Sequence, residues 1–262
     1  MRERTPLAVG IAGLGGIGSA VARWLADAAP PGLRLAAAAG RDPASVAARL
    51  AALGHPQARA VPLETLADAC DVIVECLAPE AAAVLLEHCI DRDRVIVPVS
   101  VAVLLERPAL LERARRAGTR VVVPSGAVAG LDALRAAAIG ELRAVRLRTR
   151  KPPGGLDASA DGPVRLFAGN ALDACRAFPR NVNVAATLSL AGLGGERTEV
   201  EIWSDPALAR NVHEIEIESD STRIRMSIEN LPSASNPRSS AITAHSVCAV
   251  LAGLLEPVRI GT

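Results

Sequence analysis

The stretch LAVGIAGLGGIG, Leu7–Gly18, decides the fold of the first half of the chain. An apolar run leads directly into glycines that stand first, third and sixth in the following hexapeptide, which predicts a buried strand, a tight turn and the start of a helix. Gly13 permits the turn, Gly15 leaves room for a phosphate against the backbone, and Gly18 lets the helix pack close to the strand. A glycine-rich turn with a purely structural role is the alternative. The residues expected to contact a dinucleotide here are Gly13, Gly15, Gly16, Ile17 and Gly18.

Length, composition and charge restrict the class of protein. The chain has 262 residues, half of them hydrophobic, and a formal net charge of +1. This length suffices for two modest domains. No apolar run is long enough to span a bilayer, and the N-terminus enters the first strand without a signal-peptide core, so a cytoplasmic protein is expected. Nucleic acid is not expected as a partner, because there is no basic excess and two Trp and two Phe offer no stacking platform.

The use of tyrosine and cysteine excludes some chemistries. The chain has no tyrosine, so mechanisms with a catalytic tyrosine, such as the Tyr-Lys pair of short-chain dehydrogenases, are excluded. Five cysteines show no Cys-x-x-Cys spacing. An odd, scattered set of this kind indicates reduced thiols, most of them buried as small hydrophobic residues. No metal site is expected; zinc held by Cys70, Cys76 and Cys89 is a weak alternative.

Short apolar runs alternate with helical patterns up to Val123. This alternation is typical of a parallel sheet covered by helices on both faces, with ligands bound beyond the carboxyl ends of the strands. Asp42 is expected to cap a helix that has Pro43 in its first position. Further strands are predicted over residues 33–39, 71–76, 94–98 and 120–123, and helices over 19–28, 43–53, 64–69, 79–89 and 109–117.

The end of the second predicted strand bears on the choice of cofactor. An NAD-selective unit of this type carries an acid about 20 residues after the glycines. Here the strand ends in Gly40-Arg41. An arginine in this place can face a 2′-phosphate, so we expect NADP to be accepted, beside NAD. The alternative is that Arg41 is a solvated loop charge.

The periodicity changes after Ala127, from helical spacing to alternation of apolar and charged residues. Residues 143–151, 198–203, 211–218 and 222–228 each place apolar residues on one face and arginines or glutamates on the other. This predicts a half-exposed, mostly antiparallel sheet whose charged face is simply solvated. Helices are predicted over 131–139 and 241–255, a turn at Asn236-Pro237, and loops at 153–163 and 191–196. The fold class is therefore α/β, with a Rossmann-type domain over 1–124, completed by the C-terminal helical segment 237–262, and a second α+β domain over 125–236.

Two polar side chains interrupt the apolar face of this second sheet. Strand alternation places Lys151 and His213 on the same side as the neighbouring Val, Leu and Ile residues. A lysine whose stem covers apolar surface and a hydrogen-bonded core histidine would explain both without function. The alternative is that the two form part of an active site.

Several motifs resemble those of the L-aspartate dehydrogenase family, and the resemblance runs nearly from end to end. The longest is FPRNVNVAATLSLAG over residues 178–192. The others are VPSGA at 123–127, GLDAL at 130–134, TRKPP at 149–153, DP at 205–206, NVH at 211–213, NLP at 230–232 and NP at 236–237.

The resemblance implies a Rossmann domain, an α+β second domain and a homodimer or larger assembly. It implies oxidation of L-aspartate by NAD or NADP to iminoaspartate, or the reverse amination. The iminoaspartate is either passed on to NAD biosynthesis or hydrolysed to oxaloacetate and ammonia. It assigns the active-site histidine to His213 and further cofactor contacts to Ala127 and Asn183. Cys76-Leu77 departs from the small residues common at this strand end in the family.

The chemistry of amine oxidation gives the candidate residues their roles. The amine must be neutral when hydride leaves, and an imidazole titrates in the required range. His213, alone among four histidines on the inner face of the second sheet, is the catalytic candidate, as the group that activates the water attacking the imine or that takes the amine proton. Two substrate carboxylates need partners. The substrate-binding candidates are Lys151, Arg238 with its neighbour Asn236, and the hydroxyl of Thr187.

Two other functions remain open at this point. One is reduction of another small carboxylic acid, as in dihydrodipicolinate reductases, although the adjacent histidines of that family are missing here. The other is a non-catalytic dinucleotide-binding regulator. Such a regulator would need neither the run from Asn183 to Thr187 nor a histidine on the inner face.

Overall fold

A computed structural model describes residues 5–153, 161–179, 182–233, 236–258, 260 and 261. The chain forms two compact units, which are described separately below. The first comprises Met1–Pro124 and Ala244–Pro257, and the second comprises Ser125–Thr243 and Val258–Thr262. Residues 237–243 and Val258–Thr262 thus group with the second unit, whereas the sequence placed all of 237–262 with the first.

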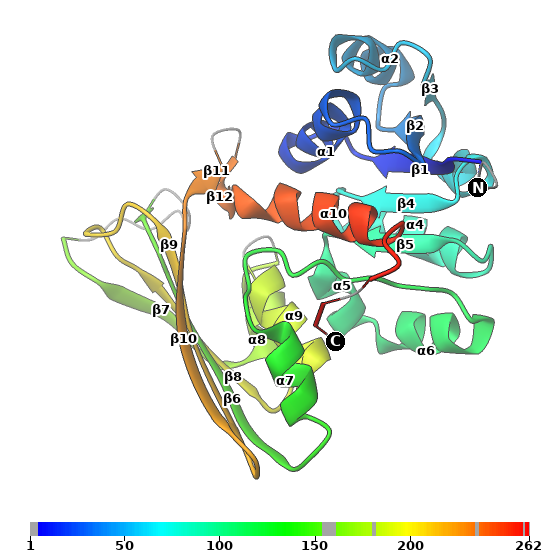
Figure 1. The fold of residues 1–262 in the computed structure, drawn as a ribbon. Coiled ribbons are helices and arrows are strands. Elements are labelled where there is room, and N and C mark those ends of the chain that lie inside the picture. Colours follow the sequence, from blue (N-terminus) through cyan, green and yellow to red (C-terminus); the bar gives the residue numbers. More distant parts are fainter. Residues whose placement is uncertain (1–4, 154–160, 180–181, 234–235, 259, 262) are drawn as a thin grey trace. The chain divides into compact units, whose positions relative to one another are not determined.

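The first unit is built on a parallel five-stranded sheet with strand order β3-β2-β1-β4-β5 (Figure 1). This is the order of a dinucleotide-binding half, and it confirms the predicted fold class. The strands are β1 Leu7–Ala12, β2 Leu33–Ala39, β3 Arg59–Ala60, β4 Val72–Glu75 and β5 Val95–Pro98.

The strand predicted over 120–123 is wrong. Val121 forms only an isolated bridge to Ile96, supported by two hydrogen bonds of 2.8 Å, from the Ile96 N–H to the Arg120 carbonyl and from the Val122 N–H to the Ile96 carbonyl. The next two bonds of a parallel ladder would need the N–H groups of Pro98 and Pro124. Proline has no N–H, so the ladder stops there.

Helices surround this sheet; α2 and α4 begin at Pro43 and Pro79 as predicted, whereas α5 was not predicted. Asp42 caps α2 as predicted, because its carboxylate accepts the backbone N–H groups of Ala44 and Ser45. The C-terminal helix returns to the first core, where Val247 and Leu251 are fully buried. None of the described helices has the length and apolar character needed to cross a bilayer. The helices are α1 Gly16–Asp27, α2 Pro43–Ala52, η1 Leu63–Thr65, α3 Leu66–Ala69, α4 Pro79–Ile90, α5 Val101–Glu106, α6 Pro108–Ala117 and α10 Ile242–Gly253.

The second unit is built on a five-stranded sheet with strand order β10-β9-β6-β8-β7. Only β6 and β8 run parallel, and the other pairs are antiparallel, as predicted for a mostly antiparallel sheet. Helices α8 and α9 pack on one face (Figure 1), which we call the inner face, and α7 packs on α9. The strands are β6 Leu142–Lys151, β7 Val164–Asn170, β8 Thr198–Ser204, β9 Asn211–Ser219 and β10 Arg223–Asn230; the helices are α7 Leu131–Ala137, α8 Ala171–Ala177 and α9 Asn183–Ala191.

Several local features of this unit differ from the sequence prediction or escaped it, among them strand β7 and helix α8, for which no element was predicted. Asn236-Pro237 is not a turn but the start of β12, Asn236–Ser240, which pairs with β11, Pro232–Ser233. Proline is tolerated there because a two-stranded ribbon leaves one edge unpaired. Helix α9 carried no amphipathic signal, because five consecutive residues from Ala185 to Ser189 are all buried.

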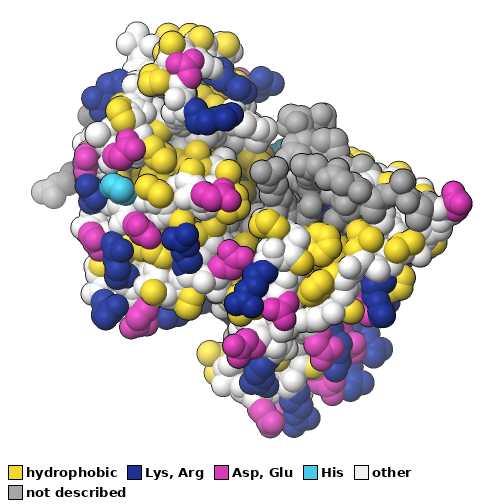
Figure 2. Space-filling model, turned by 180° about the vertical axis from the view of Figure 1, so that it is seen from behind, with side chains coloured by type: hydrophobic (Ala, Val, Ile, Leu, Met, Phe, Trp, Pro, Cys, Tyr) yellow, Lys and Arg dark blue, Asp and Glu magenta, His cyan; other side chains and the backbone are white. Residues whose placement is uncertain are grey.

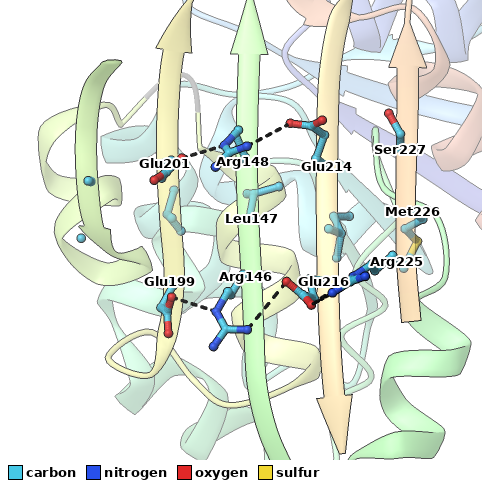
Figure 3. Close-up of a pocket in the computed structure, with 14 residues that line it drawn as sticks. Arg146, Leu147, Arg148, Glu199, Glu201, Glu214, Glu216, Arg225, Met226 and Ser227 are labelled. Carbon is cyan, nitrogen blue, oxygen red and sulfur yellow. Dashed lines mark hydrogen bonds and ion pairs between the residues drawn. The ribbon is translucent and has the colours of Figure 1, made fainter. Parts of the chain in front are cut away.

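The predicted alternation of the sheet is confirmed. Apolar side chains such as Leu147 and Ile215 are buried on the inner face, and charged side chains stand on the outer face. In Figure 3, Arg146 lies between Glu199 and Glu216, at 3.1 and 3.7 Å. Arg148 makes the equivalent pairs with Glu201 and Glu214, at 2.7 and 3.9 Å. These pairs surround an open hollow of about 840 Å³ on the outer face. Exposed pairs of this kind contribute only tenths of a kcal/mol each and mainly fix strand register.

The surface carries charges of both signs. On the face seen in Figure 2, the Lys and Arg side chains that the structure describes are interspersed with Asp and Glu. This agrees with a net charge of +1 over 57 charged side chains, 29 basic and 28 acidic. The described part of this face shows no large area of a single sign.

Candidate functional site

The glycine turn after β1 has the geometry that a dinucleotide requires. Gly13 has φ +89°, and a Cβ built there would lie 2.6 Å from the carbonyl oxygen of Cys76. A Cβ on Gly18 would lie 2.0 Å from the carbonyl oxygen of Gly13. Around a Cβ built on Gly15, no neighbouring atom of the described residues comes within 4 Å. The turn is therefore closed against itself and open toward solvent at its middle glycine.

The start of α1 supplies the donors for an anion at this opening. The helix begins at Gly16, has no side-chain cap and has no acidic residue in its first turn. Gly15 and Gly16 are exposed. The first N–H groups of a helix lack intrahelical partners, and together with the helix dipole they attract phosphate. The residues at this turn thus fit the pyrophosphate of a dinucleotide.

Arg41 lies just beyond the end of β2. The Gly13 N–H donates to the carbonyl oxygen of Ala39 at 2.8 Å, which ties the glycine turn to the end of that strand. Arg41 follows two residues later, is exposed, and makes no hydrogen bond or ion pair with the described residues. Its guanidinium is therefore available for a ligand at this edge of the sheet.

A buried carboxylate at the next strand end was missed by sequence reasoning. Glu75 is fully buried and accepts hydrogen bonds from the Leu77 N–H at 2.6 Å, the Ser100 N–H at 2.9 Å and the Ser100 hydroxyl at 3.0 Å. Burial raises its pKa against the effect of these bonds. The group joins the carboxyl ends of β4 and β5. Glu75 looks like an ordinary strand residue in sequence, because its partner Ser100 belongs to a different strand end.

A polar end interrupts the otherwise apolar inner face of the second sheet. It brings together the predicted residues Lys151 and His213 with neighbours that the sequence did not single out. All members are at most 5% exposed. We call this set the polar end; it consists of Thr149, Lys151, Ser204, Asn211, His213 and Asn230.

Lys151 is the only lysine in the chain, which otherwise carries arginine as its cationic residue. It ends β6, where the Asp205 N–H donates to its carbonyl oxygen at 2.8 Å. Asp205 is in turn held by Arg150, whose guanidinium lies 2.6 Å from the carboxylate. Burial lowers the pKa of Lys151 to about 8. The protein thus holds its one amine side chain in a buried place where the charge can be lost near neutral pH.

His213 is directly opposite Thr149 in the antiparallel pairing of β6 and β9. The Thr149 Oγ1 atom lies 3.0 Å from Nδ1 of the imidazole. Burial, together with the charge of Lys151, lowers the pKa of His213 to about 3. The imidazole is therefore neutral at physiological pH. The other three histidines differ, since His55 and His88 bond backbone carbonyls and His245 is exposed.

Acid should destabilise this protein through His213. In the unfolded chain the imidazole protonates near pH 6.5, whereas in the folded chain it stays neutral down to about pH 3. The unfolded state therefore binds more protons in this window, and stability falls as the pH falls through it. At pH 4 the loss due to this group is about 3 kcal/mol. Urea unfolding at pH 7 and pH 4 measures it, and the pH dependence of His213→Gln should be weaker by about that amount; equal dependence would contradict the assignment.

The other residues predicted to bind substrate or cofactor in the second unit lie outside the polar end. The Thr187 hydroxyl donates to the Asn183 carbonyl at 2.8 Å inside α9, so its proton is engaged. Asn183 is the first residue of α9. The Ala127 carbonyl accepts the side-chain amide of Asn230 at 3.0 Å, which ties this loop to the polar end. The side chains of Asn236 and Arg238 lie outside the described part of the structure.

Metal chemistry receives no support from the arrangement of ligands. Within the described part of the chain, no group of three or more His, Cys, Asp or Glu side chains is placed to hold a metal ion. The five cysteines are all free thiols, four of them buried. Burial raises the pKa of Cys70 to about 11, and that of Cys89 to about 12. These thiols remain protonated at physiological pH.

Comparisons with known proteins cover both units. A family model described as "Aspartate dehydrogenase, C-terminal" matches residues 132–254, and one described as "Homoserine dehydrogenase, NAD binding domain" matches residues 13–124. The chain is 42% identical to L-aspartate dehydrogenase 3 of Bordetella bronchiseptica, over 100% of both chains. It is 43% identical to an L-aspartate dehydrogenase of Bradyrhizobium diazoefficiens, over 98% of this chain and 94% of the relative.

A solved structure agrees with these sequence matches. The crystal structure of aspartate dehydrogenase from Thermotoga maritima superposes with a TM-score of 0.77 at 26% identity, covering 97% of this chain and 99% of that chain. The resemblance suggested by the motifs is confirmed over the full length. On the strength of these matches, the chain belongs to the L-aspartate dehydrogenase family.

Proposed function

We propose that this protein oxidises L-aspartate with NAD or NADP to iminoaspartate, which yields oxaloacetate and ammonia on hydrolysis. The observation that carries the proposal is the buried pair of Lys151 and His213 at the polar end of the second sheet, in a chain of the L-aspartate dehydrogenase family. A cation and a neutral imidazole suit a small dicarboxylate substrate. The glycine turn of the first unit suits the cofactor.

The direct test is an assay of the purified protein at alkaline pH. L-Aspartate is mixed with NAD and, separately, with NADP, and the absorbance of the reduced nicotinamide is followed. We expect turnover with L-aspartate and little with D-aspartate or L-glutamate, which present the second carboxylate at another place. Turnover with a different amino acid and none with L-aspartate would overturn the named substrate.

The proposed chemistry assigns each step to a group of this chain. When bound, the nicotinamide supplies the hydride acceptor. L-Aspartate reacts with its amine neutral, so that loss of hydride from the α-carbon leaves a protonated imine. His213 is the proposed catalytic residue: being neutral, it hydrogen-bonds the substrate and holds the α-carbon in place. Asn236 and Arg238 remain proposed substrate contacts, as does Thr187, whose hydroxyl would have to turn from the Asn183 carbonyl to the substrate. Ala127 and Asn183 remain proposed cofactor contacts.

Lys151 is proposed to bind a substrate carboxylate through its ammonium group. Lys151→Met removes the charge and keeps the length, and we expect the KM for L-aspartate to rise at least tenfold, because a charge-assisted contact is worth about 1.5–3 kcal/mol. The ammonium form is lost as the pH rises through about 8. The KM of the unaltered enzyme should therefore rise above that pH, the onset being shifted upward by the bound carboxylate.

The single lysine makes this prediction directly measurable. Labelling with ¹⁵N-lysine gives one side-chain signal, whose titration reports the pKa of Lys151 with and without substrate. We expect a value near 8 in the free protein and a higher one with a dicarboxylate bound. Lys151→Arg, which stays charged, should lose the pH dependence of KM. A rise in KM of less than a few-fold in Lys151→Met would remove the carboxylate role.

Arg41 is proposed to contact the 2′-phosphate of NADP. Arg41→Ala should raise the KM for NADP by about tenfold and change the KM for NAD little, since NAD lacks this phosphate. Steady-state kinetics with both cofactors measure the difference. Arg34→Ala, another exposed arginine at the opposite end of β2, is the matched control. Equal effects of Arg41→Ala on the two cofactors would contradict this contact.

The proposal extends to assembly and location. We propose a homodimer or larger homo-oligomer, in keeping with the family resemblance, and a cytoplasmic enzyme. Free thiols at all five cysteines fit a reducing compartment. Size-exclusion chromatography with light scattering measures the assembly, and the mass of a single chain at working concentration would contradict it.

A further inference from the structure

The surroundings decide which group donates the hydrogen bond between Thr149 and His213. Both side chains are buried, at 4% and 2% exposure. Either the hydroxyl donates to Nδ1, or a protonated Nδ1 donates to the hydroxyl oxygen; heavy-atom positions alone do not distinguish these arrangements. The 3.0 Å separation fits both. The deciding question is where the hydroxyl proton goes.

The described residues offer that proton only one acceptor. Thr149 makes no other side-chain hydrogen bond with them, and its hydroxyl is shielded from water. If Nδ1 carried the ring proton, the hydroxyl proton would be buried without a partner, at a cost of about 1–3 kcal/mol. If the hydroxyl donates to Nδ1, both groups are satisfied. A neutral imidazole then carries its proton on Nε2.

We propose that Thr149 is a positioning residue that holds His213 in the tautomer with the proton on Nε2, so that the imidazole meets the substrate as a hydrogen-bond donor. This proposal rests on the proposed function of His213 and specifies that the imidazole donates the hydrogen bond to the substrate. A donor beside the ammonium of Lys151 suits a substrate with two carboxylates. It also means that the resting imidazole has no free lone pair on Nε2, so His213 serves as the base neither for the amine nor for the water that attacks the imine.

Neutrality of His213 is what makes the tautomer matter. A protonated imidazole would donate from both nitrogens, and Thr149 would then decide nothing. The charge of Lys151, across the same end of the sheet, and the burial of the ring both oppose protonation. Ile228, which pairs with His213 on the other neighbouring strand, adds no charge.

The first test reads the tautomer in the protein itself. Labelling with ¹⁵N-histidine gives signals from four rings, and His213→Gln identifies those of His213. We expect the chemical shift of an unprotonated nitrogen at Nδ1 and of a protonated one at Nε2 between pH 6 and 8. A proton on Nδ1 would overturn the proposal. This readout needs no turnover, so it stands apart from the test of the proposed function with L-aspartate.

The second test uses two substitutions of Thr149. Thr149→Val keeps the shape and removes the hydroxyl, so the ring should populate both tautomers and the KM for L-aspartate should rise about tenfold, with a smaller change in kcat. Thr149→Ser keeps the hydroxyl and should restore both the tautomer and the KM. Cofactor affinity, measured by binding of the reduced nicotinamide, should stay unchanged in both.

The Thr149→Ser variant distinguishes a hydroxyl that positions His213 from a side chain that acts only by packing. If Thr149→Ser behaves like Thr149→Val, with the tautomer of His213 unchanged in both, the threonine acts by packing and the proposal fails. If Thr149→Val folds poorly, the comparison of Thr149→Ser with the unaltered protein still decides, because it retains the donor and loses only a methyl group. Restored KM with a proton on Nε2 supports the proposal.

Discussion

Replacing His213 by alanine should lower kcat/KM for L-aspartate about a hundredfold. The imidazole is neutral, buried and positioned beside Lys151, so its removal deletes a hydrogen bond to a charged substrate, worth about 1.5–3 kcal/mol. Steady-state kinetics with saturating cofactor measure the loss. The binding of the reduced cofactor should be unchanged, because His213 is not among the proposed cofactor contacts, which are the glycine turn, Arg41, Ala127 and Asn183. Near-normal turnover would remove His213 from the catalytic machinery.

His213→Gln is the informative control for this experiment. A glutamine amide can donate a hydrogen bond from about the place of Nε2, but it cannot take up a proton. If His213 works as a donor, this variant should retain clearly more activity than His213→Ala. If His213 works as a base, the two variants should be equally impaired. The pair therefore separates the two roles by activity alone.

Replacing Gly18 by alanine should destabilise the first unit and abolish cofactor binding. The added Cβ would lie 2.0 Å from the carbonyl oxygen of Gly13, a backbone atom that cannot move without opening the turn. Overpacking of this kind costs about 1–3 kcal/mol or more. Thermal unfolding and titration with the reduced cofactor measure the two effects. Normal stability together with normal cofactor affinity would contradict the described packing of α1 on β1.

Gly15→Ala is the matched control, because it adds the same methyl group three residues earlier. Its Cβ would have no neighbouring atom of the described residues within 4 Å, so stability should be preserved. Cofactor affinity should still fall, since the methyl group occupies the place expected for the pyrophosphate. The two variants together distinguish a glycine needed by the fold from one needed by the ligand. Tight cofactor binding by Gly15→Ala would place the pyrophosphate elsewhere.

Local sequence patterns were reliable where neighbours along the chain make the structure. The strand, turn and helix around Gly13 are contiguous, and the cap at Asp42 is completed within three residues. Strand alternation placed Lys151 and His213 on the inner face correctly, because side chains of a strand alternate with period two whatever the partner strand is. Helix α9 gave no such signal, because it is buried nearly all round.

Long-range pairing could not be read in the same way. The prediction of a strand at 120–123 was wrong because Pro98, on another strand, and Pro124 both lack the N–H that a longer ladder needs. The turn expected at Asn236 failed because β12 pairs with β11. The role of Glu75 became visible only through its hydrogen bonds from Ser100, which follows the next strand of the sheet.

By itself, the sequence determined the dinucleotide turn, the two-part fold class, the family, and two polar residues on an apolar face. Each rests on short-range periodicity or on a contiguous motif. Only the tertiary structure decided that Thr149 lies against Nδ1 of His213 and that burial beside Lys151 keeps the imidazole neutral. The physical reason is that strand register and burial depend on residues far apart along the chain. Thr149 and His213 are 64 positions apart, and no local sequence pattern shows that they meet.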